Sequence, residues 1–98
     1  MALNNFIQAK REEIMRIAAR HGADNVRLLG SAARGEAGPS SDVDLLVEMR
    51  PNHSPWFPAG LKADLEELLG RRVHVVTSKA LHPYIRERVL KEAVPLEG

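Results

Sequence analysis

Apolar residues recur at three- and four-residue steps through the first segment of the chain, which is the spacing of one helix face. Gly22 follows this segment as a helix-stop signal, and Asn5 with Gln8 three residues later resembles a capping box. The pattern therefore predicts a helix from Asn5 to His21. Its apolar stripe is of the kind that packs on a sheet.

Three short stretches have strand character, at residues 26–29, 42–48 and 72–77. The second stretch alternates most clearly, and alternation places successive side chains on opposite faces of a sheet. One face is expected to carry Val43, Leu45 and Val47, and the other Asp42, Asp44, Leu46 and Glu48.

Helical and loop segments separate these strands. Residues 31–36 can form one or two helical turns, and the proline-rich segment 49–60 reads as a loop. Two further helices are predicted at Leu61–Leu69 and Tyr84–Glu92. Trp56 and Phe57, at the end of the loop, are expected to staple the helix that follows rather than to stack on a base. The alternation of helices and strands indicates an α/β or α+β layer fold.

Composition and charge exclude several classes of function. The 98 residues make one small domain, residues 1–98, and the net charge of +1 does not favour a nucleic-acid partner. The chain has no cysteine, which excludes thiolate catalysis and cysteine zinc sites, and its four histidines lack the close spacing of a zinc site. No membrane span or signal peptide is apparent, so a cytoplasmic location is expected.

The most informative stretch is Gly30-Ser31, followed after ten residues by Asp42-Val43-Asp44. A glycine at a strand end lets the backbone approach a ligand closely. A serine that opens a helical turn offers a hydroxyl beside free backbone N–H groups, which bind phosphate oxygens. Gly30 and Ser31 are therefore interpreted as a phosphate cradle.

Asp42 and Asp44 lie two residues apart on a predicted strand, so their side chains share a face. Carboxylates suit hard cations such as Mg²⁺, which commonly also binds substrate phosphates. An Asp-x-Asp pair or a Gly-Ser pair alone is ordinary on a protein surface. Together, and with the pair in a strand that looks buried, they favour a site for a metal-bound nucleoside triphosphate.

The segments 30–36 and 41–47 resemble the minimal nucleotidyltransferases of the polymerase-beta-like superfamily. The resemblance implies that superfamily's fold, a small mixed sheet flanked by helices. It also implies transfer of AMP from Mg²⁺-bound ATP to a hydroxyl, often a tyrosine of a HEPN-domain toxin for which the transferase is the antitoxin. By position, Gly30 and Ser31 would hold the triphosphate, and Asp42 and Asp44 would bind the metal. Arg34, one turn beyond Ser31, either faces a phosphate or is an ordinary exposed arginine.

Two positions depart from the family pattern. Ala32 stands where an arginine often follows Gly-Ser, and His74 stands where a third carboxylate usually binds metal and acts as base. His74 is one of three things: a general base, for which its unperturbed pKa of about 6.5 suits it; the sign of a site that binds nucleotide but transfers poorly; or a strand histidine without a role.

Two functions follow from this reading. One is a metal-dependent nucleotidyltransferase, and the other is a catalytically weak nucleotide-binding antitoxin that neutralises its partner by covering it. A chain this small has no second lobe for the base or acceptor. A partner chain or a homodimer contact is therefore expected to complete the site.

Overall fold

The computed structural model describes residues 3–30, 33, 42–52, 55, 57 and 59–96. Its elements are a four-stranded sheet, helices and one short 3₁₀ turn, η1. They follow in the order α1 (Leu3–Ala9), α2 (Arg11–His21), β1 (Ala23–Leu29), β2 (Val43–Met49), α4 (Ala59–Leu69), β3 (Val73–Thr77), η1 (Ser78–Ala80), α5 (Pro83–Glu92) and β4 (Val94–Pro95).

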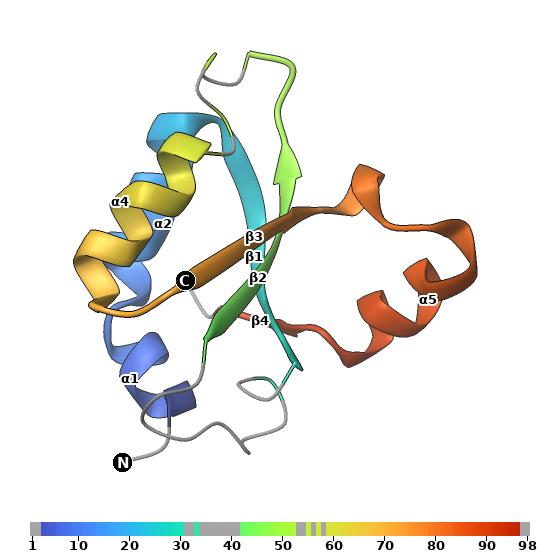
Figure 1. Cartoon of the computed structure of the whole chain (residues 1–98), viewed down its shortest axis with the longest axis horizontal. Coiled ribbons are helices and arrows are strands. Elements are labelled where there is room, and N and C mark those ends of the chain that lie inside the picture. Colours follow the sequence, from blue (N-terminus) through green and yellow to red (C-terminus); the bar gives the residue numbers. More distant parts are fainter. Residues whose placement is uncertain are drawn as a thin grey trace.

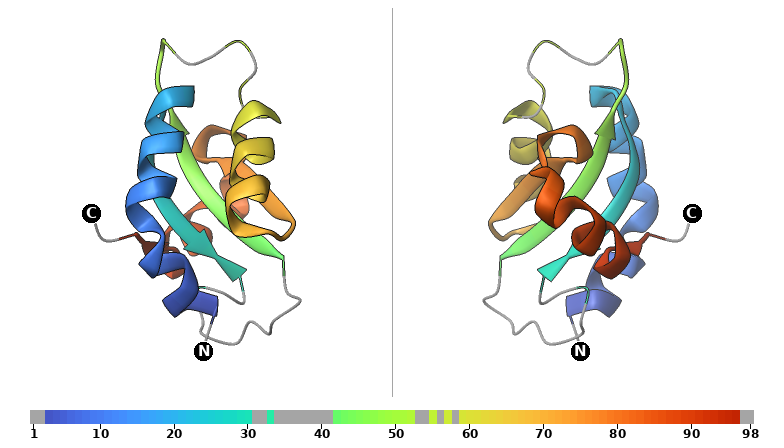
Figure 2. Two further views of the ribbon diagram at one scale, coloured as in Figure 1. Left: turned by 90° about the vertical axis from the view of Figure 1, so that its left-hand side faces the viewer. Right: turned by 90° about the vertical axis from the view of Figure 1, so that its right-hand side faces the viewer.

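The sheet is mixed, with strand order β3-β2-β1-β4. β1 runs antiparallel to both β2 and β4, whereas β2 and β3 are parallel. The helices α1, α2 and α4 cover one face, and α5 lies on the opposite side of the sheet (Figures 1 and 2). The layered α/β architecture expected from the sequence is confirmed.

The core lies between the helix-covered face of the sheet and helices α2 and α4. The alternation predicted for β2 is confirmed, because Val43, Leu45 and Val47 are all buried in this core. Phe57 packs against the same core, as expected of a staple before α4, whereas Trp56 lies outside the described residues. Leu46 is buried on the other face and stands apart from that cluster.

The long helix predicted for residues 5–21 is wrong in two respects. It starts at Leu3 rather than Asn5, and a turn at Lys10 divides it into α1 and α2. At that turn the Lys10 N–H donates to the carbonyl of Ile7 at 3.0 Å. Ile7 before the turn and Ile14 after it are both fully buried, so the spacing of apolar residues does not reveal the turn.

Strand β1 begins at Ala23, three residues before the predicted start. The sequence pattern misses this part of the strand because it contains a bulge. The pairing register with β2 shifts between Asp24 and Arg27, and Asn25 has a φ of +50°. A bulge interrupts the regular alternation of a strand, so the polar residues 24 and 25 do not show a strand pattern in the sequence. Gly22, with a φ of +83°, caps α2 as predicted.

The structure contains no helix, within the residues it describes, that is long and apolar enough to cross a membrane. Helix α5 buries none of its residues, and Tyr84 and Ile85 are exposed on it. The segment 31–36, expected to form helical turns, falls mostly outside the described residues. Ala33 is helical and packs against the core.

Glu66 joins α4 to the start of β3. Its Oε2 accepts from Lys62 Nζ at 2.8 Å and from the Val73 backbone N–H at 3.0 Å. The hydrogen bond from Lys62, with that from Val73, lowers the pKa of the Glu66 carboxyl below its ordinary value. The stability that these contacts contribute is therefore present above the unfolded-state pKa of the carboxyl and is lost as pH falls through the lower folded-state pKa.

Replacing Glu66 by glutamine is thus expected to cost stability at neutral pH and little in acid. Urea unfolding at about pH 7 and at about pH 3 measures the difference from wild type at each value. The neighbouring Glu67→Gln, at an exposed position of the same helix, is the matched control. If the wild type exceeds the Glu66 variant in unfolding free energy by the same amount at both pH values, the Glu66 carboxylate is not the source of the stability.

Candidate functional site

Three strands bring the described candidate residues to one end of the sheet. β1 ends at Leu29, which pairs with Asp44 in β2, so Gly30 follows directly beside that carboxylate. The parallel pairing of β2 with β3 sets Asp44 opposite His74. Gly30, Asp42, Asp44 and His74 therefore come from separate parts of the sequence to one edge of the molecule.

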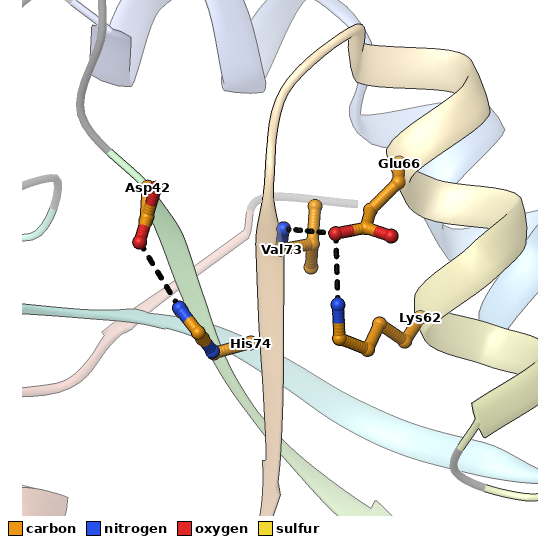
Figure 3. Close-up of polar contacts among 5 residues, drawn as sticks. All are labelled: Asp42, Lys62, Glu66, Val73 and His74. Atoms are coloured by element: carbon orange, nitrogen blue, oxygen red, sulfur yellow. Dashed lines mark hydrogen bonds and ion pairs between the residues drawn. The ribbon is translucent and has the colours of Figure 1, made fainter.

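Asp42 lies immediately before β2 and contacts His74 directly. The Asp42 Oδ2 and His74 Nε2 atoms are 3.1 Å apart, and Figure 3 shows the two side chains pointing toward each other. Both side chains are nearly half exposed, at 43% and 48%. Because exposed pairs of this kind contribute little to stability, the contact is better placed to orient groups at the site than to hold the fold together.

Asp44 is half-buried and on the same face of the sheet as His74, since paired residues in adjacent strands point to the same side. The face opposite the core thus carries both carboxylates beside the histidine. Asp42 and Asp44 lie together as the sequence predicts, and His74 lies with them.

Gly30 has a φ of +64°, in the left-handed region that favours glycine. A Cβ atom added there would lie 3.0 Å from Asp44 Oδ2, closer than side chains normally tolerate. Glycine is therefore favoured at this position by its backbone conformation and by the space that it leaves in front of Asp44. The close approach of a ligand to Gly30, inferred from the sequence, stays a prediction.

Ser31 and Arg34 lie outside the described residues, so their predicted places beside the phosphates stay predictions. Within the described part of the chain, no group of three or more histidine, aspartate or glutamate side chains is arranged to hold a metal ion. The protein groups there that could bind a cation at this edge are thus the two carboxylates, with His74 tied to one of them.

A pocket of about 310 Å³ adjoins this cluster. It is lined by Ala59 and Lys62 of α4 and by His74 and Val75 of β3, so His74 borders both the pocket and Asp42. Sequence reasoning missed the pocket. The only available signal was the four-residue spacing of Lys62 and Glu66, typical of an ion pair on a helix surface.

Comparisons with known proteins identify the family of this chain. The model of the nucleotidyltransferase domain family matches residues 11–96. A Methanocaldococcus jannaschii protein, provisionally named a protein adenylyltransferase, is 40% identical over 92% of this chain and 96% of its own length. The protein adenylyltransferase MntA of Thermococcus cleftensis is 35% identical over 94% of this chain and 90% of its own length.

Solved structures extend the likeness to the fold. One, provisionally assigned as a minimal nucleotidyltransferase, is 47% identical with a TM-score of 0.86, and the match covers 98% of this chain and 97% of that one. The Shewanella oneidensis MNT antitoxin, solved with a tri-AMPylated HEPN toxin, has a TM-score of 0.66 at 17% identity, over 97% of this chain and 72% of that one. At that identity the likeness concerns the fold alone. From the family match and the closely related sequences, the chain belongs to the nucleotidyltransferase domain family, among the minimal nucleotidyltransferases that its sequence resembles.

Proposed function

We propose that this chain, as a single minimal nucleotidyltransferase domain, transfers AMP from ATP to a hydroxyl group of a partner protein. The observation that carries the proposal is the convergence of Gly30, Asp42, Asp44 and His74 at one end of the sheet. Relatives named protein adenylyltransferases at 35–40% identity support it.

The donor set fits a divalent cation that also binds the substrate. Mg²⁺ usually takes one or two carboxylates from the protein and further ligands from phosphates and water. Asp42 and Asp44 would supply those carboxylates. When bound, the cation would neutralise triphosphate charge and orient the α-phosphate. The absence of a larger acidic cluster in the described segments is compatible with such a shared site.

The residues of the chain then have separate tasks. Gly30 leaves room for the phosphates, Ser31 is proposed to hold them with it, and Arg34 is proposed to place its positive charge beside them. The acceptor oxygen forms a bond to the α-phosphorus, the bond from that phosphorus to the bridging oxygen breaks, and pyrophosphate leaves. His74 is proposed to take the hydroxyl proton. When Nε2 donates to Asp42, the other ring nitrogen, Nδ1, has a free lone pair for this purpose.

The acceptor is proposed to be a HEPN-domain toxin encoded beside this chain, as the resemblance implies. The direct test incubates the chain with that protein, Mg²⁺ and ATP labelled on the α-phosphate. Label on the partner supports transfer. Tight partner binding without label supports the second candidate, an antitoxin that acts by covering its partner, which His74 in place of a carboxylate favours.

Gly30 offers a test of the phosphate cradle. Gly30→Ala is expected to weaken Mg-ATP binding by at least about tenfold, because the new Cβ meets the Asp44 carboxylate at 3.0 Å. Isothermal titration calorimetry with Mg-ATP measures the affinity.

Gly70 provides a matched control, since its φ is +67° and a Cβ added there meets nothing within 4 Å. Both variants should lose about 1 kcal/mol of stability from the left-handed backbone. Only the Gly30 variant should lose nucleotide affinity. Equal nucleotide affinities in the two variants would remove Gly30 from the site.

A further inference from the structure

Arg27 lies on the face of the sheet that carries the candidate site. Val26 and Leu28, its neighbours along β1, both belong to the core, so the Arg27 side chain is on the opposite face. Arg27 pairs with Leu46 in β2, two residues along that strand from Asp44. Because two residues of a strand span about 7 Å, a side chain as long as that of arginine can reach the level of the Asp44 carboxylate.

The Arg27 guanidinium has no anionic partner among the residues that the structure describes. None of the ion pairs and side-chain hydrogen bonds within those residues includes it. Its partners in the strand register, Leu46 of β2 and Pro95 of β4, carry no charge, and Arg27 is half-buried beside them. A cation that is partly withdrawn from water in this way is stabilised when an anion binds it.

The acidic residues of β1 and β2 on the side away from the site are bonded to other side chains. Asp24, three residues before Arg27, accepts from Arg50 Nε at 2.7 Å. Glu48, which pairs with Asp24 across the two strands, accepts from the side-chain amide of Asn25. These two carboxylates therefore do not neutralise Arg27, and its guanidinium is available to a ligand.

The distance along β1 separates two kinds of anionic ligand. Gly30, which the proposed function places beside the phosphates, is three residues beyond Arg27, about 10 Å along the strand. Asp44, beside which the acceptor hydroxyl would react, is nearer, at one pleat repeat. Arg27 is therefore better placed for an anion attached to the acceptor than for the triphosphate.

We propose, resting on the function proposed above, that Arg27 binds a carboxylate of the acceptor protein next to the hydroxyl that receives AMP. Helices α1, α2 and α4 cover the other face of the sheet, so the acceptor approaches the face that carries Asp44 and Arg27 (Figure 2). An arginine binds a carboxylate through two parallel N–H donors, which fixes the direction of the contact as well as its distance. Arg27 is thus a specificity residue, which selects a hydroxyl with an acidic side chain nearby and takes no part in the transfer of AMP itself.

A role in packing is the alternative for Arg27, because its aliphatic stem can cover Leu46, which is fully buried. Two replacements separate the two roles. Arg27→Met keeps an unbranched apolar stem and removes the charge, whereas Arg27→Lys keeps both the stem and the charge. Packing predicts the same result for both variants, and binding of a carboxylate predicts different results.

The test measures label transferred from ATP labelled on the α-phosphate to the HEPN-domain protein of the proposed function, over a range of concentrations of that protein. Arg27→Met is expected to raise the KM for the protein by at least about tenfold, and to leave kcat and the calorimetric affinity for Mg-ATP within about twofold of wild type. Arg27→Lys should stay within about threefold of the wild-type KM. Added salt should raise the KM of wild type more than that of Arg27→Met. Arg20→Met, the same change at an exposed position of α2 on the helix-covered side, is the matched control and should behave as wild type.

Each other outcome overturns the inference in a distinct way. If Arg27→Met has the wild-type KM for the protein, Arg27 binds no carboxylate there, although the proposed function stands. If Arg27→Met weakens the binding of Mg-ATP instead, Arg27 contacts the phosphates. Equal increases of KM in the Met and Lys variants would assign Arg27 to packing over Leu46.

Failure of the proposed function gives a separate result. If wild type transfers no label, that function fails, and calorimetric titration of the same protein into wild type and Arg27→Met decides the inference by itself. Equal affinities overturn it, and binding by the variant that is at least about tenfold weaker supports it.

Discussion

Replacing Asp42 and Asp44 together by asparagine is expected to reduce AMP transfer by at least about 1,000-fold, because the cation that orients the triphosphate loses both of its protein carboxylates. Asparagine keeps the shape of each side chain and removes only its charge. The two side chains are partly exposed at the end of the sheet, so the fold should survive. The measurement is label transferred from ATP labelled on the α-phosphate to the partner.

The matched control is Glu12→Gln with Glu13→Gln. These exposed glutamates lie on the first turn of α2, on the helix-covered side of the sheet, and their replacement removes the same two charges. Transfer by this control should equal that of wild type. Undiminished transfer by the aspartate variant would mean that the reaction does not use this acidic pair.

The second large effect concerns His74. We expect His74→Ala to lower kcat by about 100-fold and to leave the KM for Mg-ATP nearly unchanged, because a general base acts on the acceptor proton and not on nucleotide binding. His74→Asp, which puts at this position the carboxylate that the family resemblance led us to expect there, should recover part of kcat.

Measuring kcat and KM separately distinguishes a general base from a residue that only fills space. If His74→Ala transfers AMP at the wild-type rate, the base assignment is wrong. A variant with raised KM and unchanged kcat would instead place His74 in nucleotide binding alone.

The sequence predicts the layers of this fold well because buried positions recur at a regular spacing along each helix and strand. The alternation along β2 separates the core face, with Val43 and Leu45, from the site face, with Asp44. A break in a helix does not change this spacing when the same side stays buried on both sides of the break, as at Lys10 between α1 and α2. The bulge at Asn25 similarly interrupts the alternation in the first half of β1, so that half of the strand cannot be predicted from the sequence pattern.

The site was only partly predictable for a related reason. Alternation assigns faces, but sliding β3 by two residues along β2 would leave every face unchanged. The pairing of Asp44 with His74, and hence the contact of His74 with Asp42, is therefore settled by the three-dimensional register alone. The pocket depends on how α4 packs beside the β3 edge, and Ala59 carries no mark of it in the sequence.

The most direct test of the central claim is the position of the cation. Crystals of the chain with a non-hydrolysable ATP analogue and Mn²⁺ in place of Mg²⁺ allow the metal to be located by its anomalous scattering. The account predicts a peak within coordination distance of the Asp42 and Asp44 carboxylates, with the nucleotide phosphates beside Gly30. A bound nucleotide whose metal lies away from both aspartates would contradict it.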